Sequence, residues 1–147
     1  MSWSSLLAQK LRPDENGNLP RLWFLLGSEP LLAIEAQDAI RAAAFKAGYS
    51  ERKSFVFEGN ADYSPLYEAL GDQSLFGEKN LIEVVFPRAT IGKNGPAAVE
   101  ANIEHADEDK MVVVPLFDYD WTATKKDWFH HLMKAAVCNR TAPIDRN

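Results

Sequence analysis

The chain has 147 residues, of which 46% are hydrophobic and 25% are charged, and its formal net charge is −5. This length and composition are typical of one globular domain with a sizeable core. The acidic balance disfavours strong DNA binding by the domain alone, because contacts to phosphate need a basic surface. No apolar run approaches the ~20 residues of a membrane helix, and no secretion signal is recognisable. With a single cysteine, Cys138, no internal disulfide forms, and we expect a cytoplasmic protein.

The predicted elements alternate between helix and strand along the chain. A short amphipathic helix over residues 3–11 and a loop over 13–20 come first. The chain is then organised around residues 21–48, where an apolar strand, a loop at Gly27 and a helix ending at Gly48 follow one another. Further strands are predicted at 54–57, 81–86, 111–116 and 135–138, and further helices at 64–71, at 97–105 and from a capping box of Thr124 and Asp127 onward.

This strict alternation predicts an α/β fold, a three-layer parallel sheet of about five strands flanked by helices, with right-handed crossovers. Glu83 is a polar exception inside the strand predicted at 81–86. An unpaired buried carboxylate is costly, so Glu83 is expected near a strand end or beside a cationic partner.

The glycine loop after the first strand is the place where sheets of this kind often bind phosphate. A Walker A loop that begins at Gly27 needs glycine, lysine and a hydroxyl residue where Leu32, Ala33 and Ile34 stand. The dinucleotide pattern of three glycines fails at the same loop. The chain therefore has the frame of a P-loop fold without the residues that hold phosphate, and no cofactor is expected.

Other groups of residues are weak signals of catalysis or metal binding. His130 and His131 are adjacent, so on a helix they point about 100° apart and cannot converge on a metal without further ligands. Asp118 and Asp120 follow a strand end, where active-site carboxylates often lie, but a solvated loop is the simpler interpretation. Cys138 has no activating neighbours. No catalytic residue and no metal ligand is therefore predicted.

Two large apolar residues, Leu75 and Phe76, stand side by side in a predicted loop at 72–77. In one interpretation, one of them packs inward and the other is a half-buried anchor. In the other, both project as a hydrophobic plug that enters a pocket of a partner protein. Composition alone leaves both interpretations open.

Three stretches resemble the delta subunit of bacterial DNA polymerase III: residues 21–32, residues 35–41, and Ser74-Leu75-Phe76. The resemblance is close over residues 21–87 and continues more weakly to Asn139. It implies an AAA+-like N-terminal domain that has lost its nucleotide site, in agreement with the missing Walker residues. It further implies that residues 1–140 form this clamp-binding domain and that 141–147 begin a linker to C-terminal domains.

The resemblance also implies partners and a site. Delta subunits work in the clamp loader with gamma or tau subunits and a delta-prime subunit, on DNA. They open the beta sliding clamp by inserting a Leu-Phe pair into a hydrophobic pocket of the ring. Carried over to this sequence, the wedge is Leu75 and Phe76, with Ser74 shaping the turn and Gln73 before it.

The resemblance thus implies a non-catalytic binding module, although the parent subunit belongs to the DNA polymerase III holoenzyme, a DNA-directed DNA polymerase and nucleotidyltransferase. The alternative is a small α/β nucleotide-binding protein or enzyme with its site at the carboxyl ends of the strands. The loop after the first strand argues against this alternative.

Overall fold

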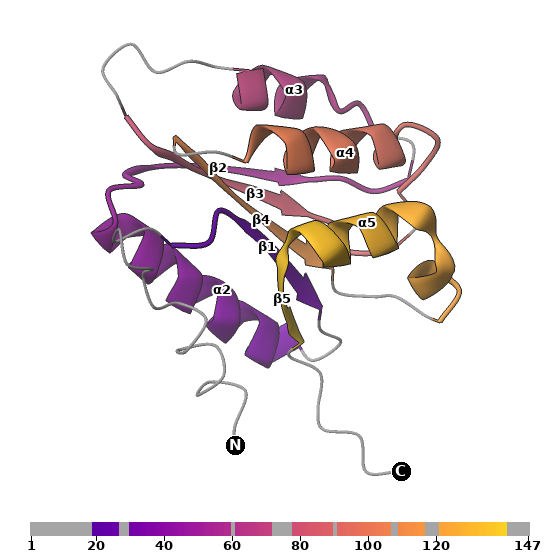
Figure 1. Ribbon diagram of the computed structural model, residues 1–147, viewed down its shortest axis with the longest axis horizontal. Helices are drawn as coiled ribbons and strands as arrows, with labels where there is room; N and C mark the ends of the chain where they lie inside the picture. The colour runs from indigo at the N-terminus through magenta and orange to yellow at the C-terminus, as the bar shows by residue number, and fades with distance from the viewer. Residues whose placement is uncertain are drawn as a thin grey trace.

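The computed structural model describes residues 19–26, 30–59, 61–71, 78–89, 91–106, 109–116 and 121–140 (Figure 1). The helix predicted at 3–11 lies outside these residues. None of the described helices is long and apolar enough to cross a membrane. In chain order the described elements are β1 (Leu22–Leu26), α2 (Pro30–Lys46), β2 (Glu51–Val56), α3 (Ser64–Gly71), β3 (Asn80–Val85), α4 (Gly95–His105), β4 (Lys110–Leu116), the 3₁₀ turn η1 (Ala123–Lys125), α5 (Asp127–Ala135) and β5 (Val137–Arg140).

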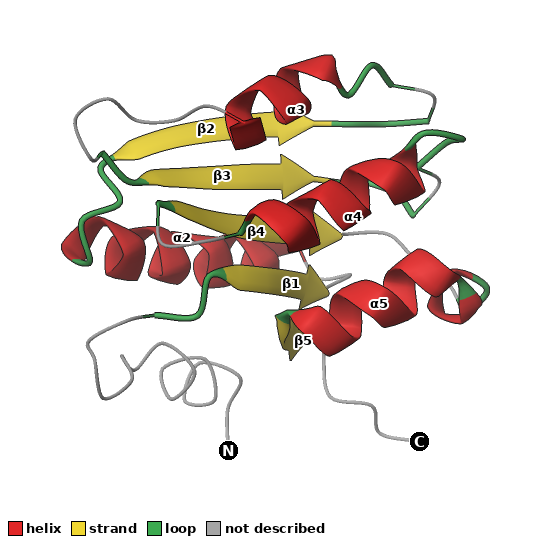
Figure 2. Cartoon of the chain, turned by 45° about the horizontal axis from the view of Figure 1, so that its top comes forward, coloured by secondary structure: helices red, strands yellow, loops and turns green. Residues whose placement is uncertain are grey.

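The described strands form one sheet in the order β2-β3-β4-β1-β5, and all neighbouring strands are parallel. Figure 2 shows α2 on one face of the sheet and α3, α4 and α5 on the other. The predicted three-layer α/β fold with a parallel sheet of five strands is confirmed. β1 lies between β4 and β5, so its side chains are buried on both faces.

Each face of the sheet has its own core, because successive side chains of a strand point to opposite faces. On the α2 face, Trp23 is fully buried and packs with the small residues Ala36 and Ala44, which let the helix approach closely. On the other face, Phe24 meets Phe129 of α5 edge to face, with 5.2 Å between the ring centroids. These two cores explain why β1 reads as a continuous apolar run.

Glu83 has the cationic partner that its place inside a strand predicts. Its side chain is fully buried in β3, and Arg41 of α2 donates two hydrogen bonds to it. The Nε–Oε2 distance is 2.5 Å and the Nη2–Oε1 distance is 3.0 Å. The hydrogen bond to Glu83 is the main cause that raises the pKa of Arg41 above its ordinary value. A bidentate pair of this kind is how a charged carboxylate is accommodated in a core.

The end of α2 matches the stop predicted at Gly48. Gly48 has φ of +101°, a left-handed conformation that glycine adopts readily. Its N–H donates to the carbonyl of Phe45 at 3.1 Å, and the N–H of Tyr49 donates to the carbonyl of Ala44 at 3.0 Å. This pair of bonds is a Schellman motif, which satisfies the last carbonyls of the helix.

Two predicted strands, β2 and β5, differ in their limits by two residues or more. β2 begins at Glu51, three residues before the predicted start at Ser54, because the polar residues at its beginning lie on an exposed edge strand and carry no hydrophobic signal. β5 covers Val137–Arg140 rather than 135–138, because Ala135 still belongs to α5 and the N–H of Ala136 donates to the carbonyl of Leu132.

The predicted capping box of Thr124 and Asp127 is wrong. Thr124 lies in η1, where its hydroxyl donates to the carbonyl of Trp121 at 2.5 Å. The cap position of α5 is Lys126, which makes no side-chain capping bond. Asp127 instead occupies the first turn, where a carboxylate complements the positive end of the helix dipole.

Candidate partner-binding site

The predicted wedge residues, Gln73, Ser74, Leu75 and Phe76, lie outside the described residues. The structure describes the two elements that flank them, α3 before the segment and β3 after it. The geometry of these two elements decides how firmly the ends of the segment are held.

α3 is fixed to the sheet on its inner face and at its start. Leu66, Ala69 and Leu70 are buried against the sheet. Tyr63, just before the helix, is buried as well, and its hydroxyl donates to the carbonyl of Ile91 at 2.8 Å. Burial raises the pKa of the Tyr63 hydroxyl above its ordinary value. The helix that leads into the predicted wedge is therefore held by packing and by a buried hydrogen bond.

The first turn of α3 has a polar anchor at the surface. The Oδ1 atom of Asp62 accepts hydrogen bonds from the hydroxyl of Ser64 at 2.7 Å and from the N–H of Ser64 at 3.0 Å. These two bonds, the hydroxyl first, lower the pKa of the Asp62 carboxyl below its ordinary value. The carboxylate thereby satisfies one of the N–H groups that a helix leaves unpaired at its start.

The other end of the segment joins β3, which is also held on both sides. The N–H of Asn80 donates to the carbonyl of Asp109 at 2.7 Å. The ammonium group of Lys79 lies 5.2 Å from the ring centroid of Tyr49, a buried residue. Residues 72–77 thus connect two elements that are each held by packing and hydrogen bonds.

The carboxyl ends of β1 and β4 form a topological switch point, the usual ligand position in open parallel sheets. The two strands are neighbours, and the helices that follow them, α2 and α5, cover opposite faces (Figure 2). Asp118, Asp120 and the loop at Gly27 lie outside the described residues. Ile34, which stands at the hydroxyl position of a Walker motif, is 52% exposed on α2. The absence of a nucleotide site stays a prediction.

His130 and His131 lie on α5, and Cys138 lies on β5. His130 is exposed on α5, and the Nδ1 atom of its neighbour His131 lies 2.5 Å from Oε2 of Glu100, which joins α5 to α4. Cys138 is half-buried in β5. Within the described ranges, no group of three or more His, Cys, Asp or Glu side chains is arranged to hold a metal ion.

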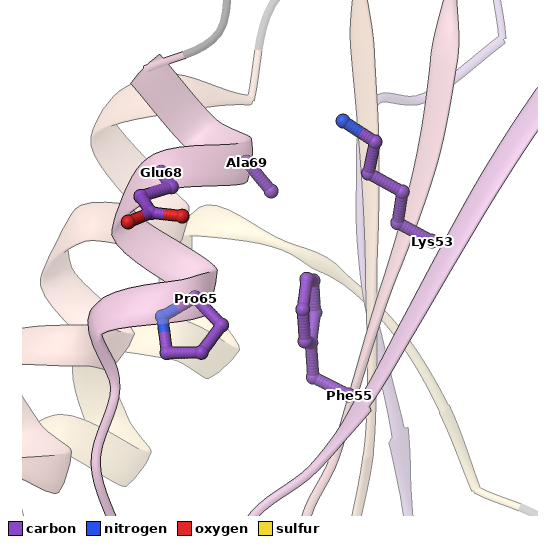
Figure 3. A pocket seen from close by; sticks show the side chains of 5 residues that line it. All are labelled: Lys53, Phe55, Pro65, Glu68 and Ala69. Atoms are coloured by element: carbon purple, nitrogen blue, oxygen red, sulfur yellow. The ribbon is translucent and has the colours of Figure 1, made fainter.

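Sequence reasoning missed a pocket between β2 and α3. This open pocket of about 450 Å³ is lined by Lys53, Phe55, Pro65, Glu68 and Ala69 (Figure 3). Lys53 and Phe55 are two residues apart on β2, so their side chains lie on the same face of the sheet, and the other three residues lie on α3. The sequence indicates that Lys53 and Phe55 share a face, but it does not indicate which helix completes the pocket.

Comparison with known proteins decides which family the chain is part of. Residues 23–140 match the family model described as DNA polymerase III, delta subunit. The chain belongs to this family. The matched range includes Leu75 and Phe76, the residues that the resemblance assigns to the wedge. The delta-subunit resemblance found in the sequence is thus confirmed at the level of the family.

Two curated relatives carry the name DNA polymerase III subunit delta. The protein from Escherichia coli (strain K12) is 32% identical over 93 residues, which cover 63% of this chain and 26% of that protein. The protein from Haemophilus influenzae is 24% identical over 115 residues, which cover 76% of this chain and 32% of that protein. The chain therefore spans about a quarter to a third of the length of these delta subunits.

Proposed function

We propose that this chain is the N-terminal domain of a clamp-loader delta subunit and that it binds and opens the beta sliding clamp during DNA replication. The observation that carries the proposal is membership of the delta-subunit family over a range that includes the segment at 72–77. The proposed contact is a hydrophobic wedge of Leu75 and Phe76, with Ser74 shaping the turn and Gln73 at its edge.

The chemistry of the wedge suits a binding role. Fully burying a leucine or phenylalanine side chain is worth roughly 1.5–3 kcal/mol. Two neighbours in one pocket supply a large part of a micromolar affinity, which corresponds to about 8 kcal/mol. The anchoring of α3 through Leu66 and Leu70 supports this role, because a partner that pulls on the segment then acts on a rigid domain.

In this proposal the domain performs no chemistry of its own. ATP is bound by the gamma or tau subunits, and these, together with delta-prime and DNA, are partners of the whole delta subunit. In this proposal clamp binding belongs to this domain, and loader assembly belongs to the later domains of the family.

The proposal is tested by titrating the chain with the beta sliding clamp and, separately, with Mg-ATP in a calorimeter. We expect saturable binding of the clamp in the micromolar range and no binding of Mg-ATP in that range. If the clamp does not bind, the proposal is contradicted. If Mg-ATP binds tightly and the clamp does not, the alternative of a nucleotide-binding protein is favoured.

A further inference from the structure

The outer edge of β2 offers main-chain hydrogen bonds to a further strand. β2 is the terminal strand of the sheet. The N–H of Glu51 donates to the carbonyl of Lys79, and the N–H of Phe57, just after β2, donates to the carbonyl of Val85, so both groups face β3. Since alternate residues of a strand direct their N–H and C=O groups to opposite sides, Arg52, Ser54 and Val56 direct theirs away from β3. All three residues are exposed, and no described strand pairs with this edge.

The pocket between β2 and α3 lies beside this edge (Figure 3). Its apolar part comes from Phe55, Pro65 and Ala69, and Lys53 brings a cation at the start of the strand. On the opposite face of β2, outside the pocket, Val56 is 64% exposed and adds an apolar side chain to the end of the edge. The edge therefore begins with the acidic Glu51, is basic at Arg52 and Lys53, and is apolar at its end.

We propose that the β2 edge binds an extended segment of a partner protein as an additional strand. The segment is acidic where it passes Arg52 and Lys53 and apolar where it passes Phe55 and Val56. Main-chain hydrogen bonds to β2 hold the segment, and the pocket accepts one of its apolar side chains. Glu68 lines the α3 side of the pocket, so the side chain that enters the pocket is apolar rather than acidic.

The charges on β2 argue for such a segment and against a second copy of this chain. Antiparallel self-pairing centred on Ser54 places Arg52 opposite Val56 and Lys53 opposite Phe55, so cations face apolar side chains. Self-pairing centred on Arg52 or on Lys53 places that cation opposite its own copy, which is destabilising. Basic side chains on an edge strand oppose self-association, and opposite charges directly across a strand pair are favourable.

Synthetic peptides test this proposal against the folded chain. The probes are capped peptides that contain Asp-Asp-Thr-Val-Leu or its reverse, because a strand can add in either direction, and matched peptides with lysine in place of aspartate. We expect one acidic peptide to shift the amide NMR signals of Arg52, Ser54 and Val56 and to slow their hydrogen exchange. Amides of Lys53 and Phe55, which face β3, change less. The matching lysine peptide binds at least about fivefold more weakly.

Charge reversal provides the decisive control. The variant Arg52→Glu/Lys53→Glu should bind the acidic peptide at least about fivefold more weakly than the unmodified chain does, and it should bind the lysine peptide more tightly. If the double variant does not fold, the single variant Arg52→Glu takes its place. Clamp binding, assigned to Leu75 and Phe76, should not change. The proposal is overturned if neither acidic peptide binds or if binding ignores the charge. A dimer of the free chain that Ser54→Pro abolishes would overturn it in favour of a second copy.

Discussion

Arg41 and Glu83 join the middle of α2 to the middle of β3 through two hydrogen bonds, although they are 42 residues apart in the sequence. α2 is the one described helix on its face of the sheet (Figure 2), and many of its inner side chains are small alanines. The ion pair therefore fixes where this helix lies across the strands. It also neutralises a carboxylate that has no contact with water.

Replacing Arg41 by methionine should lower the free energy of unfolding by about 3–5 kcal/mol, because Glu83 is left charged and unpaired in the core. Urea denaturation measures the change. Asp38→Ala is the matched control: Asp38 also contacts Arg41, but its side chain is 61% exposed, so the expected loss is below about 1 kcal/mol. The double variant Arg41→Met/Glu83→Leu should recover most of the stability. A nearly neutral Arg41→Met variant would contradict this account.

Gly95→Ala should destabilise the domain, although alanine usually favours a helix over glycine. A Cβ atom at Gly95 would lie 2.4–2.7 Å from side-chain atoms of Ile91, which is itself buried. Overpacking of this kind costs typically about 1–3 kcal/mol. Gly71→Ala is the control, since nothing lies within 4 Å of its Cβ position. Thermal melting should show a lower midpoint for Gly95→Ala and an unchanged or higher one for Gly71→Ala; equal midpoints would refute the clash.

Tyr63→Phe should lower the free energy of unfolding by about 1–3 kcal/mol, because the carbonyl of Ile91 loses its buried donor. Tyr67, which is 43% exposed on α3, provides the control, and Tyr67→Phe should leave stability nearly unchanged. Chemical denaturation of both variants measures the difference. Equal stabilities would show that the hydrogen bond does not anchor the start of α3.

The carboxyl of Asp62 should titrate below its ordinary pKa of 3.8. Folding lowers this pKa, so the ionised carboxylate stabilises the folded state at pH values above the ordinary pKa of 3.8. This stabilisation is lost as the pH falls through the lowered pKa of the folded state. Ser64→Ala removes the hydroxyl that is the larger cause and should raise the pKa part of the way back, because the N–H bond remains. NMR titration of the carboxyl follows both proteins. An unchanged pKa in the variant would disprove the role of the hydroxyl.

Buried elements were the most predictable part of the fold. The run at β1 and the valines of β4 are enclosed on both faces, so their apolar sequence alone indicates parallel strands. The start of β2 was missed because residues on an exposed edge strand need not be apolar. The capping box failed because the hydroxyl of Thr124 bonds within a 3₁₀ turn, which the spacing of two residues does not reveal.

The sites were harder to predict than the fold. The sequence predicted that Glu83 lies near a strand end or beside a cation, but not that Arg41 supplies the cation, because Arg41 lies on a helix far away in the sequence. The pocket beside Phe55 could not be predicted from the sequence either, because side chains of α3 complete it. The wedge at Leu75 and Phe76 rests on the family resemblance, because two neighbouring apolar residues in a loop also fit an arrangement in which one packs inward and the other is a half-buried anchor.

The central claim is tested most directly by the clamp affinity of the double variant Leu75→Ala/Phe76→Ala, measured beside its melting temperature. We predict binding at least about a hundredfold weaker, a loss of ~2.8 kcal/mol at 1.4 kcal/mol per decade, with an unchanged melting temperature. Phe45→Ala is the matched control, because Phe45 is an apolar side chain 69% exposed on α2, and it should bind the clamp normally. Unchanged affinity in the double variant, or a collapsed melting temperature with normal binding by the protein that still folds, would contradict the wedge.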